Sequence, residues 1–265
     1  MDLDLSGKTA LVTGSTGGIG YAIARELCDL GAAVGVNGRT AERVEAALET
    51  LRGEAKAGRC FAAAGDVATQ AGVDGLVAAL PAVDILVNNT GIFEPKPFFD
   101  IPDGDWQRFF EVNVMSGVRL SRAYAPGMAE RGWGRVIFIS SESALNVPTE
   151  MVHYGMTKTA QLAISRGLAQ TVAGSGVTVN SVLPGPTLSE GVATFMKQMA
   201  GGGSDLDLDA LGRQFVADHR PSSLIRRLAA VDEVASLVAY LCSPAASATT
   251  GAALRVDGGV LQGLA

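Results

Sequence analysis

The chain has 265 residues, of which 48% are hydrophobic and 18% charged, and its 33 glycines and high apolar content indicate a compact globular domain, not a disordered or fibrous chain. Its net charge of -6, without any cluster of lysine and arginine, argues against a general nucleic-acid-binding protein, which needs many phosphate contacts. The acidic N-terminus lacks the layout of a signal peptide, and the longest uncharged stretch, 167–189, is broken by glycine and proline. We therefore expect no membrane span.

The cysteines give no sign of a disulfide framework or a metal site. Cys28, Cys60 and Cys242 are odd in number, far apart in the sequence and surrounded by apolar residues. This pattern predicts buried, reduced thiols in a cytoplasmic protein. Neither the cysteines nor the two histidines show metal-ligand spacing, so we expect no metal.

The first elements of the chain predict a phosphate-binding turn. An apolar strand pattern at 8–13 runs into a glycine-rich stretch, and a helical pattern follows at 21–30. Backbone N–H groups and the positive end of the helix then point at the same place. The glycine spacing differs from the common G-x-G-x-x-G fingerprint, but the strand and helix around it favour phosphate binding over a simple tight connection. The residues expected to hold the cofactor here are Gly14, Ser15, Thr16, Gly18, Ile19 and Gly20.

The second strand pattern, 32–36, ends in Asn37-Gly38-Arg39. An NAD site normally places an acidic residue here for the ribose 2′-hydroxyl, whereas arginine accommodates the 2′-phosphate of NADP. No acidic residue occurs before Glu42. Arg39 therefore favours NADP, with NAD possible and a solvated loop charge as the alternative for Arg39.

Strand and helix patterns alternate through the remaining chain. Strands are expected at 60–64, 83–87, 135–139, 177–183 and 252–256, and helices at 41–51, 73–80, 105–131, 154–172 and 231–241. This alternation predicts one α/β domain spanning 1–265, a doubly wound Rossmann fold with a parallel sheet covered on both faces. The alternation stops at 188–227, where helices at 192–199 and 208–217 flank a triple glycine. We expect this segment to be a substrate lid, with a decorative insertion as the alternative.

The stretch from Ser141 to Lys158 holds the candidate catalytic groups. Tyr154 and Lys158 are four residues apart and share one face of a helix, so the ammonium is expected to lower the pKa of the phenol. Tyr154 could then exchange a proton with an alcohol or carbonyl oxygen. Ser141 follows the strand at 135–139, at the edge of the sheet where catalytic groups gather.

Taken together, these motifs resemble the short-chain dehydrogenase/reductase family over nearly the whole chain. Thr13-Gly14-x3-Gly18-Ile19-Gly20 matches the family's nucleotide-binding turn, and Asn88-Asn89-Thr90-Gly91 is similar to its Asn-Asn-Ala-Gly segment. The family's catalytic tetrad is matched in type and order by Asn113, Ser141, Tyr154 and Lys158. Thr90 stands where the family usually has alanine. Threonine adds a hydroxyl near the expected cofactor position without removing a catalytic group.

The resemblance implies a role for each matched residue. Tyr154 would be the general acid/base, assisted by Lys158, which would also hold the nicotinamide ribose. Ser141 would polarise the substrate oxygen, and Asn113 would hold a water that links Lys158 to solvent. The implied cofactor contacts are Asp66 and Val67 at the adenine, Asn88 and Gly91 at the nearby ribose and backbone, Pro184 and Gly185 at the turn after the sixth strand, and Thr187 at the carboxamide. The resemblance also implies a homotetramer, or at least a dimer, built from the helices at 105–131 and 151–172 and the C-terminal segment.

The function predicted from the sequence is an NAD(P)-dependent oxidoreductase that interconverts a secondary alcohol and a ketone by hydride transfer. The alternatives are a lyase or epimerase on the same fold and a non-catalytic NADP-binding sensor. The substrate is a small carbonyl or alcohol compound of open identity. Polar residues that could touch it, or only form loop hydrogen bonds, are Glu142, Asn146, Glu150 and His153. Apolar residues that could line its pocket, or only pack in the core, are Phe93, Phe98, Phe195, Met196 and Met199.

Overall fold

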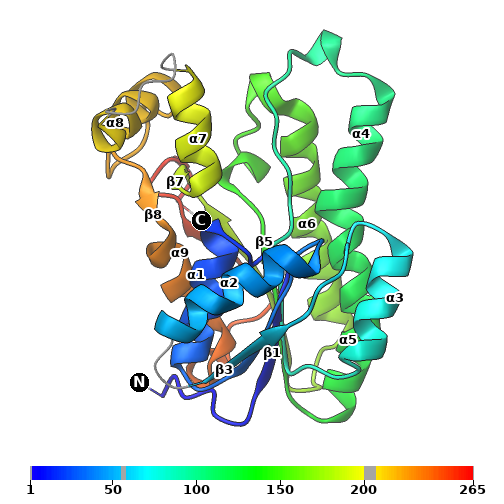
Figure 1. The fold of residues 1–265 in the computed structure, drawn as a ribbon. Coiled ribbons are helices and arrows are strands. Elements are labelled where there is room, and N and C mark those ends of the chain that lie inside the picture. Colours follow the sequence, from blue (N-terminus) through cyan, green and yellow to red (C-terminus); the bar gives the residue numbers. More distant parts are fainter. Residues whose placement is uncertain (1, 55–57, 200–206, 265) are drawn as a thin grey trace.

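The computed structural model describes residues 2–54, 58–199 and 207–264. Its centre is a parallel sheet of seven strands in the order β3-β2-β1-β4-β5-β6-β9 (Figure 1). The strands are β1 Thr9–Val12, β2 Ala33–Val36, β3 Arg59–Ala62, β4 Ile85–Asn88, β5 Gly134–Ile139, β6 Val177–Pro184 and β9 Ala253–Val256. This is the doubly wound α/β fold predicted from the alternation of elements.

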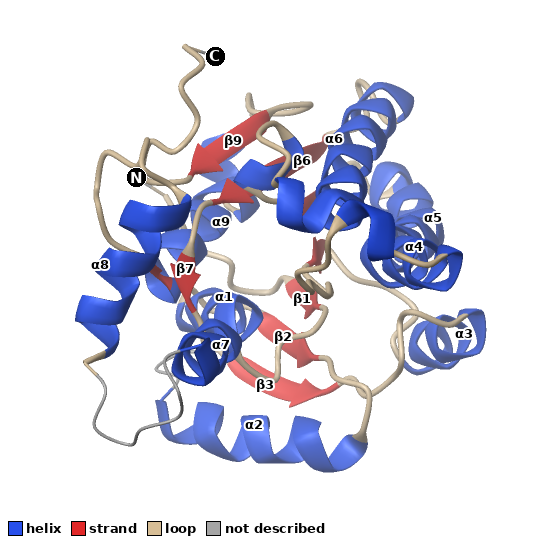
Figure 2. Ribbon diagram, turned by 90° about the horizontal axis from the view of Figure 1, so that it is seen from above, coloured by secondary structure: helices blue, strands red, loops and turns tan. Residues whose placement is uncertain are grey.

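Helices cover both faces of the sheet. One face carries α1 Gly18–Asp29, α2 Ala41–Glu54 and α9 Val231–Cys242, and the other carries α3 Gln70–Ala79, α5 Ser116–Glu130 and α6 Val152–Thr171. Seen from above, the two groups of helices enclose the sheet (Figure 2). Short 3-10 turns complete the connections: η1 Phe98–Asp100, η3 Glu142–Ala144, η4 Thr149–Met151 and η5 Pro244–Ala246. Across the described residues, no helix is both long and apolar enough to cross a membrane.

The strands form a core on each face because neighbouring side chains point in opposite directions. Ala10 and Val12 of β1 pack under α1 and α9, whereas Leu11 packs under α3 and α5. Every residue of β4, β5 and β6 is buried. A strand buried on both faces reads as a continuous apolar run, which holds for the apolar parts of β4 and β5, whereas β6 also buries Thr178, Asn180 and Ser181.

The long helix expected at 105–131 is interrupted. It consists of α4 Asp103–Phe110, a π-helical turn η2 Glu111–Met115, and α5. A π turn inserts an extra residue and frees a backbone carbonyl from the regular ladder, and such turns occur often at functional sites. Here the carbonyl of Asn113 instead accepts a hydrogen bond of 2.6 Å from Gln161 Nε2 of α6. The interruption therefore fixes α6 to α5 beside the predicted site.

The segment 188–227 contains the two helices expected there, α7 Glu190–Met199 and α8 Leu208–His219. Both lie beside each other above the α1 side of the sheet (Figures 1 and 2). A two-stranded ladder of β7 Thr187–Leu188 and β8 Ala229–Ala230, which the sequence did not indicate, joins the two ends of the segment. A small apolar cluster of Met196, Val216 and Leu228 packs the helices together. The glycines at 201–203 lie outside the described residues.

Gly117 on α5 offers a test of the helix-to-sheet packing. A methyl group there would lie 2.8 Å from Phe138 Cε1 and 3.4 Å from Asn88 Cγ, and Phe138 is fully buried. We expect Gly117→Ala to lower the free energy of unfolding in urea by about 1–3 kcal/mol, because the packed ring must move. Gly104→Ala on α4 is the control, since a methyl there meets nothing within 4 Å. Equal losses in the two variants would contradict this account of the packing.

Candidate active site

Two adjoining cavities open where the strands of the sheet end. The first, the Tyr154 cavity, has a volume of about 260 Å³, and Ser141, Tyr154 and Lys158 lie in its wall. The second, the Arg39 cavity, has a volume of about 250 Å³ and lies over the ends of β1, β2 and β3. Gly91 and Ile92 line both cavities. The fold therefore brings segments that are far apart in the sequence to one continuous cleft.

The glycine-rich turn after β1 is anchored by buried hydrogen bonds. Asn37, at the end of β2, accepts a hydrogen bond from Gly14 N and donates to the carbonyls of Ala63 and Gly65. Ser15 Oγ donates to Val12 O and accepts from Asn37 N. Ser15 is thus fully buried and supports the turn from behind. Ser15 was predicted as a cofactor contact, whereas Asn37 was not predicted, although its position directly after a strand was the available signal.

A second asparagine holds the same turn from the other side. Asn89 Nδ2 donates to the carbonyls of Thr13 and Gly14 at 2.9 and 3.1 Å. A methyl at Gly20 would lie 2.5 Å from the Gly14 carbonyl oxygen, so glycine is required for this close approach. Gly14 and Gly18 both have positive φ angles, 60° and 58°. The turn leaves Gly14 and Thr16 on the Arg39 cavity and Ile19 on the Tyr154 cavity.

The Arg39 cavity has a cationic rim. Arg39 and Arg43 both line it and both are exposed, and neither forms an ion pair with any residue that the structure describes. Asp66 and Val67, predicted at the adenine, lie in the same wall. Arg43 was not predicted, although it stands one helical turn after Arg39. Two unpaired guanidinium groups make this end of the cleft suited to a phosphate.

The predicted catalytic side chains converge in the Tyr154 cavity. Lys158 Nζ donates to the carbonyl of Ile139 at 2.9 Å and lies 5.5 Å from the centre of the Tyr154 ring. Ser141 Oγ accepts a hydrogen bond of 3.1 Å from Ser143 N, which turns the loop after β5. The turn after β6 supplies Pro184, Gly185 and Thr187 to the opposite part of the wall.

The pKa values in this cavity are governed by burial. Burial raises the pKa of Tyr154 to about 12, against a smaller lowering by its hydrogen bond with Ser141. Burial also lowers the pKa of Lys158 to about 8. The net lowering of the Tyr154 pKa expected from Lys158 is therefore wrong, because desolvation of the phenol dominates and the ammonium, directed at the carbonyl of Ile139, is not among the groups that shift it.

The two asparagines predicted at the site lie behind its wall. Asn88 is buried and donates to Ser121 Oγ, so its neighbour Asn89 lines the Tyr154 cavity in its place. Asn113 bonds to the backbone of Ile92 through both side-chain atoms and is buried. A methyl at Gly91 would lie 3.5 Å from both Asn113 Oδ1 and Lys158 Nζ. Asn113 thus sets the position of the chain between the two cavities.

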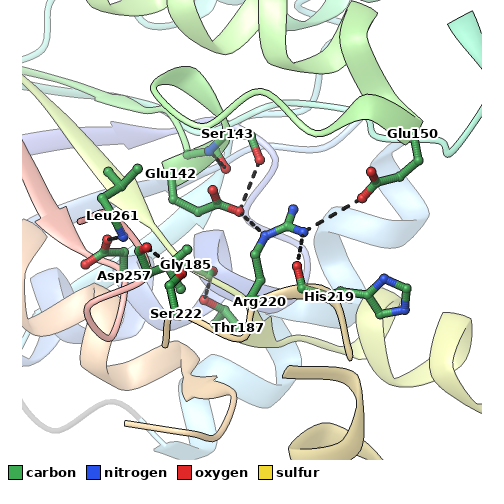
Figure 3. A network of polar contacts seen from close by, with 12 residues as sticks. Glu142, Ser143, Glu150, Gly185, Thr187, His219, Arg220, Ser222, Asp257 and Leu261 are labelled. Carbon is green, nitrogen blue, oxygen red and sulfur yellow. Dashed lines mark hydrogen bonds and ion pairs between the residues drawn. The ribbon is translucent and has the colours of Figure 1, made fainter. Parts of the chain in front are cut away.

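A buried ion pair completes the polar part of the Tyr154 cavity. Arg220 Nε donates to Glu142 Oε1 at 2.7 Å, and both residues line the cavity (Figure 3). The sequence analysis treated Glu142 as a possible substrate contact and did not single out Arg220. Burial raises the pKa of Glu142, although Arg220 opposes that shift.

The other residues proposed to touch the substrate divide between cavity, surface and core. Phe93 lines the Tyr154 cavity, but Phe98 does not and Asn146 is exposed elsewhere. Those that do not line this cavity also include Glu150, 3.8 Å from Arg220 Nη1, His153, packed against Phe109, and Met196, in the cluster between α7 and α8. The side chains of Phe195 and Met199 lie outside the described residues.

Comparison with known proteins identifies the family. The short chain dehydrogenase family model matches residues 8–200. The oxidoreductase YvaG of Bacillus subtilis is 51% identical over 99% of both chains, and the 7alpha-hydroxysteroid dehydrogenase of Escherichia coli K12 is 34% identical over 99% of this chain and 98% of its own. The chain belongs to the short-chain dehydrogenase/reductase family. It is an NAD(P)-dependent oxidoreductase that acts on CH–OH and C=O groups.

Solved structures of this family superpose over the whole chain. L-sorbose reductase of Gluconobacter frateurii, in complex with NADPH and L-sorbose, is 34% identical with a TM-score of 0.91 and full coverage of both chains. A 7α-hydroxysteroid dehydrogenase in complex with NADH and 7-oxo glycochenodeoxycholic acid is 31% identical with a TM-score of 0.82, covering 100% of this chain and 98% of its own. One neighbour thus binds NADPH, which carries a 2′-phosphate, and the other binds NADH, which lacks it.

The residues of the cleft fit a nicotinamide dinucleotide. A side chain at Gly14 or Gly20 would fill the turn where the backbone must approach a pyrophosphate, and the N-terminus of α1 points at the same place. Arg39 and Arg43 offer cations at one end of the cleft, and Tyr154, Lys158 and Thr187 offer hydrogen-bonding groups at the other.

The buried ammonium of Lys158 should destabilise the fold in a pH-dependent way. Lysine titrates near 10.5 in the unfolded chain and near 8 here, so between these values the unfolded state holds a proton that the folded state has lost. The contribution of Lys158 to stability therefore rises with pH across that window and is most unfavourable below pH 8. We expect Lys158→Met to increase the free energy of unfolding at pH 7 by about 1–2 kcal/mol, with the gain shrinking towards pH 10. Urea unfolding of both proteins at each pH measures this, and a gain that does not change with pH would contradict it.

Proposed function

We propose that this enzyme interconverts a secondary alcohol and a ketone by hydride transfer, with Tyr154 as the general acid/base. The observation that carries the proposal is the convergence of Ser141, Tyr154 and Lys158 in one cavity, beside the wall formed by Gly185 and Thr187. The named relatives support it, since L-sorbose and a 7-oxo bile acid both present a ketone. The bound nicotinamide would supply or accept the hydride.

In this mechanism the protein side chains position the substrate oxygen and move its proton. Ser141 hydrogen-bonds the oxygen and stabilises the charge that develops on it. Tyr154 donates its proton to that oxygen in reduction and removes it in oxidation. Because burial raises the pKa of Tyr154 to about 12, the phenol is protonated at neutral pH and is ready to act as an acid. The protein alone therefore favours reduction at neutral pH, with oxidation gaining as the pH rises.

Lys158 and Asn113 support the proton transfer in this proposal. With a pKa near 8, Lys158 can gain or lose a proton close to neutral pH. We assign it the exchange of protons with Tyr154 and the binding of the nicotinamide ribose. Asn113 is proposed as a positioning residue that holds Gly91 beside Lys158 and helps link Lys158 to solvent.

We further propose that the enzyme prefers NADP, because Arg39 and Arg43 line the cavity where the adenosine ribose would lie. Asp66, Val67 and Gly91 would contact the adenosine half, and Pro184, Gly185 and Thr187 the nicotinamide half. A homotetramer or dimer built from α4, α5, α6 and the C-terminal segment is also proposed, with a cytoplasmic location in keeping with three free cysteines. The segment 188–227 would close over the substrate.

The role of Tyr154 can be tested by removing its hydroxyl. We expect Tyr154→Phe to lower kcat by a factor of at least about 10²–10⁴, because the proton donor is lost, with NADPH affinity nearly unchanged. Absorbance of the nicotinamide with a panel of ketones and secondary alcohols measures turnover, and protein fluorescence measures binding. Tyr21→Phe is the matched control, since Tyr21 hydrogen-bonds Glu54 on the surface. Undiminished turnover by Tyr154→Phe would contradict the assignment of Tyr154 as the general acid/base.

Cofactor choice can be tested at the cationic rim. We expect Arg39→Ala to weaken NADPH binding about 10- to 100-fold and NADH binding little, because only NADPH carries the 2′-phosphate. Arg52→Ala, on the exposed surface of α2, is the control for a general loss of positive charge. Equal losses of affinity for NADPH and NADH would contradict the proposed preference for NADP.

A further inference from the structure

The buried pair of Glu142 and Arg220 has no role in the hydride and proton transfers described above. Glu142 is 3% exposed and the Arg220 side chain 12%, and both line the Tyr154 cavity. Glu142 directly follows Ser141 in the sequence, and both residues line the cavity in which the reacting oxygen would lie. Arg220 comes from the end of α8, on the segment 188–227. The pair therefore joins the catalytic loop to the segment above it.

Each member of the pair has hydrogen-bonding capacity left over. Glu142 Oε1 accepts from Arg220 Nε and Ser143 Oγ, but its second oxygen, Oε2, is buried without a hydrogen-bond partner. Arg220 Nη1 donates to the carbonyl of His219, and Nη2 makes no hydrogen bond to any residue that the structure describes. A buried acceptor without a partner is unfavourable, and native proteins rarely keep one without a reason. Figure 3 shows the two side chains facing each other between the loop and α8.

One kind of ligand group matches both leftover positions. A hydroxyl can donate to a carboxylate and accept from a guanidinium at the same time. A carboxylate on the ligand would be repelled by Glu142, and an apolar group would leave both positions unpaired. Glu142 and Arg220 cancel each other's charge, and Glu150, 3.8 Å from Arg220 Nη1 and outside the cavity wall, adds a negative charge nearby. The wall therefore disfavours an anion and suits a neutral molecule with a hydroxyl group at this point.

Building on the proposed function, we propose that the substrate is a neutral polyhydroxylated ketone or the corresponding polyol. A hydroxyl near its reacting carbon lies between Glu142 and Arg220. Phe93 and Phe215 face the carbon skeleton from other parts of the cavity wall. Glu142 and Arg220 thus set specificity, whereas Ser141 and Tyr154 perform the reaction.

The test compares six-carbon alcohols that differ in their hydroxyl groups and in their charge. The hexitols D-sorbitol, D-mannitol and galactitol are neutral and polyhydroxylated, 2-hexanol lacks the extra hydroxyls, and D-gluconate adds a negative charge. We expect the wild-type enzyme with NADP⁺ to show a higher kcat/KM for at least one hexitol than for 2-hexanol or D-gluconate. A preference for 2-hexanol or D-gluconate would overturn the inference.

Variants of the pair show whether these two residues cause the preference. We expect Arg220→Leu to lower the hexitol to 2-hexanol ratio of kcat/KM about 10- to 100-fold, and Glu142→Gln to lower it less, because the amide keeps the shape and one acceptor. The double variant Glu142→Gln/Arg220→Leu removes both charges and avoids an unpaired buried carboxylate if Arg220→Leu folds poorly. Glu233→Gln is the control, because it breaks an exposed pair with Arg227 outside the cavity. An unchanged ratio in folded pair variants would show that the pair serves only to join the two segments.

Calorimetric titration separates this inference from the proposed reaction. Each alcohol is titrated into the NADP⁺-loaded wild type and into the double variant. Hexitol binding that the double variant loses, without turnover in the wild type, would overturn the proposed reaction and uphold the substrate class. Turnover of 2-hexanol with no hexitol binding would uphold the proposed reaction and overturn the proposed substrate class.

Discussion

The hydrogen bonds that Asn37 and Asn89 make to the turn after β1 are the constraint on which the cleft depends. They tie the ends of β1, β2 and β4 together and hold Gly14 and Gly20 close enough that no side chain fits between them. Because both asparagines are satisfied inside the protein, the turn is rigid before any ligand arrives, which reduces the entropy lost on binding. The N–H groups of Gly14 and Ser15 are used in this anchoring, which leaves the N-terminus of α1 to face a phosphate.

Burial is the second constraint, and it has opposite consequences for stability and for chemistry. It lowers the pKa of Lys158 to about 8 and raises that of Tyr154 to about 12. Both shifts mean that the charged form is disfavoured, but at neutral pH only the Lys158 shift lowers stability, because the Tyr154 phenol is neutral in the folded and the unfolded chain alike. The same shifts bring Lys158 into the range where it exchanges protons readily and keep Tyr154 protonated as an acid. Functional sites commonly carry such a loss of stability.

The segment that follows Thr187 is joined to the loop after β5. Thr187, just before the segment 188–227, pairs with Ala229, just after it, so the segment is anchored at both ends. Arg220 then reaches from α8 to Glu142, one residue after Ser141. A ligand that bridges Glu142 and Arg220 would add contacts between the segment and the catalytic loop. In the proposed mechanism, substrate recognition and closure of the segment would involve the same few side chains.

The sequence by itself determined the order of the strands of the main sheet and of the helices between them, because buried strands are rich in apolar residues and glycine marks the tight turns. It also determined the family and the candidate groups Ser141, Tyr154 and Lys158, because their chemistry and spacing are local properties. Only the tertiary structure decided which asparagine of the pair Asn88 and Asn89 faces the cleft, that the π turn places Asn113 behind Gly91, and that burial dominates the pKa of Tyr154. The meeting of Glu142 with Arg220, 78 residues later, was equally hidden. Each of these depends on burial and on contacts between distant segments, and a local sequence pattern indicates neither.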